Sequence, residues 1–236
     1  MTQPSRSLIR ITGDDRVSFL QGILTNDIAK LNDDKIQFAA LLSPQGKILH
    51  DMFLIAVGNA IIIDTQTEYK NTLLKRLAMY KLRAKVGIEE ITLHDASLTT
   101  HQPLPDPRHP ALPHYAPLTT HHAPLHLGIP ELGRDFFPDE VVPLDAGYDL
   151  LNAISFTKGC YVGQEVTARM HYKNIARRGF YILTNDTMPT RLALLKFAEV
   201  EDAGGTATVD NVTYQARLPE WMQPKLAQFR SSRATQ

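Results

Sequence analysis

Phe156-Thr-Lys-Gly-Cys-Tyr-Val-Gly-Gln-Glu-Val-Thr-Ala-Arg-Met170 contains the only cysteine of the chain. Cys160 follows Gly159, and Lys158 precedes it by two positions. Glycine at 159 and at 163 permits a tight backbone turn and a close approach to another group. A nearby ammonium, and amides at the start of a helix, favour the thiolate form of a cysteine. The segment indicates a reactive thiol, although a lone cysteine is commonly a small buried core residue, and both interpretations stay open.

The residues after the cysteine are suited to hydrogen bonding. Gln164 offers a neutral carboxamide and Glu165 a charged carboxylate. This combination is the type needed to hold the amide edge of a heteroaromatic ring. The same segment could therefore contribute to a ligand site.

Composition limits the class of protein. The chain has 236 residues, of which 43% are hydrophobic, so it can bury a core. No apolar run is long enough for a membrane span, and no secretory signal is recognisable, so we expect no membrane association. A single cysteine excludes an intramolecular disulfide and, with the missing signal, predicts a reducing, cytoplasmic location. One thiol also cannot hold a stable iron–sulfur cluster alone.

The charges balance overall, with 25 basic and 25 acidic residues, which gives no general attraction to nucleic acid. Locally, the stretch from Lys70 to Lys85 is basic. It is typical of a solvated helix face. The other interpretation is an anion site, for phosphates or for a pteridine with a glutamate tail.

Hydrophobic periodicity predicts an α+β arrangement of mainly antiparallel sheet, because strands and helices do not alternate regularly. We expect residues 1–100 to form an N-terminal α+β part, with a hairpin turning at Gly58-Asn59 and a helix beginning at Thr67. The predicted strands are 8–11, 37–42, 48–57, 60–63, 85–88 and 91–94, and a further helix is predicted at 14–24.

Residues 101–127 are predicted to be a connector rich in proline and histidine. The stretch 101–130 holds eight of the fifteen prolines and six of the nine histidines. Proline at this density blocks regular strand pairing. The more specific interpretation is a metal site, but the spacings of the histidines fit no compact ligand motif, so we predict no metal site.

The chain becomes regular again after the connector. Residues 128–178 are predicted to form a second part that carries the cysteine segment. Residues 179–236 are predicted to form a short C-terminal β module, with strands at 180–183, 192–200 and 206–214 and a frayed tail from Ser231.

Lys158-Gly-Cys-Tyr-Val-Gly-Gln-Glu165 resembles the Lys-Gly-Cys-Tyr-x-Gly-Gln-Glu signature of the YgfZ family. Four further stretches resemble other blocks of that family in order and spacing, so that the likeness covers roughly residues 6–180. These stretches are 19–27, 42–47 with Asp51, 80–86, and 128–131 with Gly133 and Asp135.

The resemblance implies a glycine-cleavage T-protein-like fold, with antiparallel sheets and helices around a central folate cavity. It further implies tetrahydrofolate as cofactor and a role in assembling or repairing iron–sulfur enzymes, including tRNA-modifying ones. Cys160 would be the functional thiol. The residues that would shape its site are Lys158, Gly159, Tyr161, Gly163, Gln164, Glu165 and Arg169, and those that would contact folate are Asp27, Asp51, Arg83 and Glu131.

Three alternatives remain. The first is a true aminomethyltransferase, but T-proteins place an aspartate where this chain has Asn71, and asparagine cannot take up the charge role. The second is a folate-binding scaffold without turnover. The third, direct tRNA binding through residues 70–85, is the least supported because the net charge is zero. Whether the chain is an enzyme stays open, and an accessory factor is favoured over a transferase.

Overall fold

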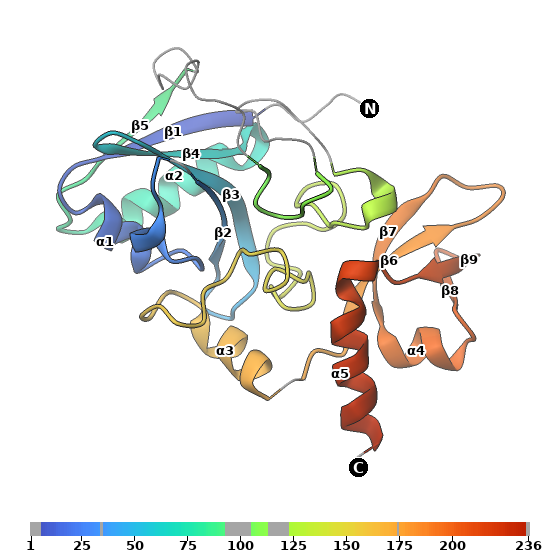
Figure 1. Cartoon of the computed structure of the whole chain (residues 1–236). Coiled ribbons are helices and arrows are strands. Elements are labelled where there is room, and N and C mark those ends of the chain that lie inside the picture. The colour runs from blue at the N-terminus through green and yellow to red at the C-terminus, as the bar shows by residue number, and fades with distance from the viewer. Residues whose placement is uncertain (1–5, 34, 93–104, 113–122, 174, 235–236) are drawn as a thin grey trace. The chain divides into compact units, whose positions relative to one another are not determined.

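The computed structural model describes residues 6–33, 35–92, 105–112, 123–173 and 175–234 (Figure 1). The chain divides into an N-terminal unit, residues 1–121 and 151–164, and a C-terminal unit, residues 122–150 and 165–236. The boundaries expected at 100, 127 and 178 differ from this division. Residues 151–164 return to the N-terminal unit, where the Ser155 N–H donates to the Thr25 carbonyl (3.0 Å) and the Thr25 hydroxyl donates to the Ala153 carbonyl (2.6 Å).

The N-terminal unit is built on a five-stranded antiparallel sheet with the strand order β2-β3-β4-β1-β5 (Figure 1). The hairpin expected at Gly58-Asn59 joins β3 to β4, where Gly58 has a φ of 53°. The elements are β1 (Arg6–Thr12), α1 (Arg16–Gln21), η1 (Ile28–Lys30), β2 (Ile36–Leu42), β3 (Ile48–Val57), β4 (Ala60–Gln66), α2 (Thr67–Lys81) and β5 (Gly87–Ile91).

Alternation along the strands separates the two faces of this sheet. Met52 and Leu54 of β3 share one buried core cluster with Leu73 and Leu77 of α2. Successive strand residues point to opposite faces of the sheet, so the odd-numbered residues of β3, Asp51 among them, lie on the face away from the helices. One face therefore holds the helix-packed core, and the other face, which is also buried along most of β3, makes a separate set of contacts.

Two element predictions for this unit were wrong. The helix expected at 14–24 ends at Gln21, because Leu24 leaves it to pair with Leu41 of the sheet. The strands expected at 85–88 and 91–94 are one strand, β5, paired along β1. The last two residues of the strand expected at 91–94 lie outside the described residues, as do residues 101–104 and 113–122 of the connector.

The C-terminal unit contains a four-stranded antiparallel sheet with the order β7-β6-β9-β8. Aromatic rings of Tyr181, Phe197 and Phe229 pack in its core. The elements are η3 (Leu125–Leu127), α3 (Gln164–Tyr172), β6 (Arg178–Thr184), β7 (Arg191–Lys196), α4 (Phe197–Asp202), β8 (Thr206–Val209), β9 (Val212–Arg217), η4 (Glu220–Met222) and α5 (Gln223–Ala234).

Three predictions for this unit were wrong. The strand expected at 192–200 ends at Lys196, and α4 begins at the next residue, Phe197. The single strand expected at 206–214 is instead two strands, β8 and β9, joined by a turn. Asp210 and Asn211 adopt φ values of 52° and 63° in this turn and reverse the chain. Ser231, expected to be frayed, belongs to α5, which buries Leu226 and Phe229. The last two residues of that expected tail are not described.

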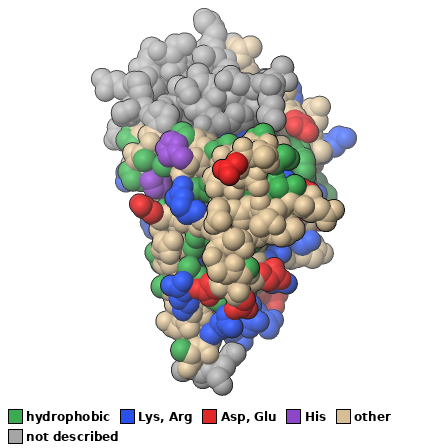
Figure 2. Space-filling view, turned by 90° about the vertical axis from the view of Figure 1, so that its right-hand side faces the viewer, with side chains coloured by type: hydrophobic (Ala, Val, Ile, Leu, Met, Phe, Trp, Pro, Cys, Tyr) green, Lys and Arg blue, Asp and Glu red, His purple; other side chains and the backbone are tan. Residues whose placement is uncertain are grey.

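The surface of the C-terminal unit carries both signs of charge. Figure 2 shows Lys and Arg side chains interspersed with Asp and Glu. Within this unit, Arg191 pairs with Asp210 and Lys196 pairs with Glu199. Across the described ranges, no helix has the length and apolar character needed to cross a membrane.

Candidate functional site

Cys160 is exposed at the surface of the N-terminal unit. The interpretation of a sealed core cysteine is therefore wrong for this chain. Its neighbour Gly159 is exposed as well, and a Cβ placed there would meet nothing within 4 Å. The tip of the loop is thus open, and the reason for its conformation must lie in the residues on either side.

Lys158 fixes the first side of the loop. Its ammonium donates hydrogen bonds to the backbone carbonyls of Gln21 (2.7 Å), Leu24 (2.6 Å) and Asn26 (2.8 Å). Carbonyls at and beyond the end of a helix lack partners within the helix, and α1 ends at Gln21. An ammonium has three N–H donors, so all of them are used here. Lys158 therefore acts as a structural clamp between the loop and the end of α1.

The surroundings of Lys158 affect its charge. Burial lowers the pKa of Lys158 to about 8, and the carboxylate of Asp27 partly opposes this change. The ammonium also lies 5.0 Å from the centre of the Tyr161 ring. The structure thus brings together Asp27 and Lys158, two residues predicted to have functional roles.

The other side of the loop is fixed by three residues of the motif. Tyr161 is buried, and its backbone N–H donates to Oε1 of Gln164 (2.9 Å). Gly163 has a φ of 76°, and a Cβ there would clash with the Ser43 carbonyl and come within 2.8 Å of the Leu42 side chain. Only glycine satisfies both the backbone angle and this close approach. The motif loop therefore packs against the turn that follows β2.

Glu165 and Arg169 extend from α3 and are exposed. Arg169, expected to help shape the site of Cys160, forms no ion pair within the described ranges. Both residues lie in the C-terminal unit, whereas Gln164 is the last residue of the N-terminal unit. The geometry therefore assigns neither of them a role in shaping the loop.

The four residues predicted to contact folate lie in different environments. Asp27 pairs with Lys30 (3.1 Å), and a hydrogen bond from Gln21 (2.9 Å) lowers its pKa. Arg83 follows α2 and is exposed, without an ion pair among the described residues. The core places α2 on the helix-packed face of the sheet, so the structure does not bring Arg83 together with Asp51.

Glu131 belongs to a turn of the C-terminal unit. It pairs with Arg134 (2.8 Å) and accepts a hydrogen bond from the Ala123 N–H (2.8 Å). Arg134 also pairs with Asp135 (2.7 Å). These contacts stabilise the turn itself, so Glu131 has a structural role in this unit.

Asp51 is the member of the set that lies beside aromatic rings. It is buried on β3, next to Phe53, whose ring centre is 5.3 Å from that of Phe38. The guanidinium of Arg108 lies over both rings, 5.8 Å from Phe38 and 5.0 Å from Phe53, and the Arg6 guanidinium lies 5.3 Å from Phe53. We call Phe38, Asp51, Phe53, Asp64, Arg6 and Arg108 the aromatic–charged face.

Two ion pairs hold the charges on this face. Arg6 binds the fully buried Asp64 (2.7 Å), and Arg108 binds Asp106 (2.8 Å). Both members of the Arg108–Asp106 pair are buried. No local pattern pointed to this pair, because Asp106-Pro-Arg108 lies in the stretch predicted to be a connector and has no periodicity.

The aromatic–charged face suits a pteridine in its chemistry. Aromatic rings can stack on a flat heterocycle, and a buried carboxylate can accept hydrogen bonds from ring N–H groups. By contrast, no three His, Cys, Asp or Glu side chains come together as a metal site within the described residues. His101, His114, His121 and His122 lie outside those residues.

The comparisons with known proteins first define the class of fold. The chain has the glycine-cleavage T-protein fold: it matches the crystal structure of glycine cleavage system aminomethyltransferase T from Bartonella henselae with a TM-score of 0.62. The match covers 92% of this chain and 84% of that chain at 13% sequence identity. The predicted fold class is therefore confirmed.

The comparisons with curated proteins then point to a narrower group. The chain is 29% identical over 214 residues to the protein named iron-sulfur cluster assembly factor IBA57 homolog, mitochondrial, of Pyricularia oryzae, covering 74% of this chain and 54% of that protein. It is 28% identical over 235 residues to iron-sulfur cluster assembly factor IBA57, mitochondrial, of Homo sapiens, covering 78% and 66%. The chain spans about half to two thirds of these relatives. No protein-family model matches it.

Proposed function

We propose that this chain is a folate-binding accessory protein of the YgfZ type that assists the assembly or repair of iron–sulfur enzymes. Two of its similar proteins are named iron–sulfur cluster assembly factors, and its fold is that of T-protein. The observation that carries the proposal is the presentation of Cys160. The thiol is exposed, while Lys158 and Tyr161 on either side are held by contacts within the protein.

A single exposed thiol suits work on a cluster held mainly by another protein. Clusters usually need several thiolates, and this chain has one. Cys160 can therefore donate one sulfur ligand to iron while a partner supplies the others. In this view, the cluster is the cargo and the fixed loop keeps the thiol in place.

Tetrahydrofolate is assigned to the aromatic–charged face on the chemistry of its side chains. Asp51 would accept hydrogen bonds from the N–H groups of the pteridine, and the buried rings of Phe38 and Phe53 would stack on it once the Arg108 guanidinium, which lies over both rings, moves aside. Arg6 and Arg108 are paired with buried aspartates, so they would offer the glutamate tail hydrogen-bond donors and no net positive charge. When bound, the cofactor supplies a reduced pteridine able to carry a one-carbon unit.

The test of the thiol is a Cys160→Ser substitution in a strain that depends on this gene for iron–sulfur enzyme activity. We expect the variant to fold with an unchanged circular dichroism spectrum and to lose complementation. The matched control is Thr157→Ser on the same exposed stretch, which should complement fully. Full complementation by the Cys160→Ser variant would overturn the proposed role.

The folate assignment has a separate test by calorimetry. We expect tetrahydrofolate to bind the intact chain and an Asp51→Asn substitution to weaken binding by about tenfold, which is the effect of losing one charged hydrogen bond. Asp33→Asn, at an exposed position, is the control and should leave binding unchanged. The absence of binding to the intact chain would remove folate from the proposal without touching the role of Cys160.

The transferase alternative gains no support from the geometry. Asn71 is exposed on α2, and the nearby Asp64 is fully buried and paired with Arg6. A glycine-cleavage assay with a lipoylated carrier decides between the two activities, and we expect no turnover. Service to tRNA-modifying enzymes and a cytoplasmic location are further proposals. The relatives carry the word mitochondrial in their names, so cell fractionation is the relevant measurement for location.

A further inference from the structure

The turn at the end of α2 presents a leucine to solvent. Leu82 is 87% exposed, and its φ of 43° and ψ of −108° suit the first central residue of a type II′ turn. A hydrogen bond from the Ala84 N–H to the Lys81 carbonyl (2.8 Å) closes this turn. Glycine is the usual residue at such angles, and a leucine strains the backbone. Because the side chain is also exposed, the fold alone does not account for a leucine here.

The backbone that follows Leu82 is fixed by the segment between β1 and α1. The Lys85 N–H donates to the carboxylate of Asp15 (2.7 Å). Gly13 approaches so closely that a Cβ placed there would lie 2.1 Å from the Lys85 carbonyl oxygen. Val86 is buried. The turn is therefore held by α2 on one side and by these contacts on the other, and it keeps Leu82 in its exposed position.

The exposed face of α2 continues from Leu82 to Met79 and Lys75. Residues at steps of three and four lie on one side of a helix. Met79 is 57% exposed, and Lys75 is exposed as well. The opposite side of α2 lies along the sheet, where Leu73 and Leu77 join the core (Figure 1). We call the exposed end of this helix and its turn the α2-end surface, which consists of Lys75, Met79, Lys81, Leu82 and Arg83.

The α2-end surface is positively charged and lacks acidic residues. The chain has no Asp or Glu from residue 69 to residue 88. Lys75, Lys81 and Arg83 form no ion pair with any carboxylate in the part of the chain that the structure describes. Their charges are therefore not balanced by the protein itself.

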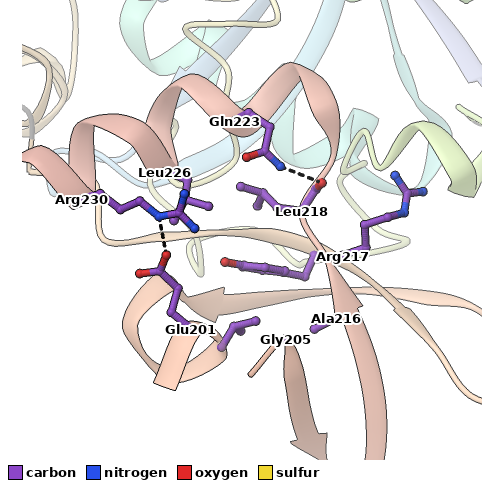
Figure 3. Close-up of a pocket in the computed structure, with 10 residues that line it drawn as sticks. Glu201, Gly205, Ala216, Arg217, Leu218, Gln223, Leu226 and Arg230 are labelled. Carbon is purple, nitrogen blue, oxygen red and sulfur yellow. Dashed lines mark hydrogen bonds and ion pairs between the residues drawn. The ribbon is translucent and has the colours of Figure 1, made fainter. Parts of the chain in front are cut away.

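Other acidic residues are already engaged with other basic residues. Glu89 and Glu90, the first acidic residues after the turn, each take part in an ion pair with a basic residue outside the α2-end surface. Figure 3 shows Arg230 beside Glu201 in a hollow of the C-terminal unit, where the two side chains form an ion pair of 2.5 Å. The α2-end surface differs from these places because its basic residues lack such partners.

We propose that the α2-end surface docks an acidic segment of a partner protein. An apolar side chain of that segment packs on Met79 and Leu82, and its carboxylates pair with the basic residues around them. A nucleic acid would gain little from an exposed leucine, because bases stack on aromatic rings. A lipid surface takes up a broader apolar face than two side chains. The proposal goes beyond the proposed function, since it needs neither folate nor Cys160.

The experiment selects peptides from a phage library of random sequences on the full chain. The selected peptides are synthesised with a fluorescent label, and their binding is measured by anisotropy. We expect sequences in which Asp and Glu surround an aliphatic or aromatic residue, and we expect added salt to weaken their binding, because the charges are exposed. Vesicles of phosphatidylglycerol and transfer RNA are the comparison probes. If either of them binds and Arg83→Glu abolishes that binding, the surface serves a lipid or a nucleic acid and the proposal is overturned.

Two variants locate the docking site. Arg83→Glu and Leu82→Gly should each weaken peptide binding by about tenfold. Leu82→Gly should also leave the melting temperature unchanged or raise it, because glycine adopts these angles without strain. Lys35→Glu, at an exposed position of the same unit, is the matched charge reversal and should leave binding unchanged.

Three results contradict the proposal. The first is a selection that yields no peptides or only peptides without acidic residues. The second is binding to Arg83→Glu and Leu82→Gly that equals binding to Lys35→Glu. The third is a lower melting temperature of Leu82→Gly, which would show that the leucine serves the fold.

Discussion

Replacing Lys158 by Met tests whether the lysine is the clamp that holds the motif loop. Met keeps an unbranched apolar side chain but has no donor for the carbonyls of Gln21, Leu24 and Asn26, which now receive bonds of 2.6–2.8 Å. Hydrogen bonds to a charged group contribute about 1.5–3 kcal/mol each, and water can replace part of three bonds that share one ammonium. We therefore expect the variant to lose about 3 kcal/mol of stability.

The loss is measurable by urea denaturation followed by circular dichroism. With a slope of about 2 kcal/mol per molar urea, the midpoint should fall by about 1.5 M. The alkylation rate of Cys160 should change as well, because the loop is released from α1. Lys35→Met is the control, since Lys35 is exposed in the same unit. If Lys158→Met behaves like Lys35→Met in both measurements, the clamp does not exist.

Three further predictions concern other parts of the N-terminal unit. Gly163→Ala should destabilise the protein by about 2 kcal/mol or more, since it combines a positive φ with a clash at the Ser43 carbonyl; an unchanged melting temperature contradicts this. Burial, with a smaller effect of Arg76, lowers the pKa of His50 from 6.5 to about 4. Between these pH values the unfolded chain binds a proton at His50 that the folded chain does not, so about 3 kcal/mol of stability should be lost as the pH falls from 6.5 to 4. A His50→Gln variant should not show this pH dependence of stability. Arg108→Ala should weaken tetrahydrofolate binding in calorimetry by about tenfold, whereas Lys35→Ala should not.

Local patterns predicted the N-terminal unit well. The hairpin around Gly58 and the helix from Thr67 follow from turn residues and hydrophobic spacing, which are properties of short segments. The hairpin at Asp210 was missed because two non-glycine residues adopt positive φ there, and the flanking strand residues read as one continuous strand. The helix α4 was missed because Phe197 and Val200 are apolar residues that suit a strand equally well.

The candidate site depended on contacts that no local pattern reveals. Lys158 reaches carbonyls more than one hundred positions earlier in the chain, and Arg108 reaches the rings of β2 and β3 from a proline-rich stretch. Backbone carbonyls carry no residue signature, so the partners of Lys158 could not be named from the sequence. The resemblance to a family directed attention to the residues of the motif, but it did not supply a physical reason for their positions.

The structural contacts of the motif residues give them different roles. Lys158 holds the end of α1, Gly163 permits contact with the turn after β2, and Gln164 holds the Tyr161 backbone. Each of these residues is explained by the fold alone, and none needs a ligand or a partner. Cys160 is different, because it is exposed and sits at the open tip of a loop whose flanks are fixed. A cysteine that serves only the fold is usually buried, so the exposure of Cys160 supports the proposal that its thiol acts on a partner.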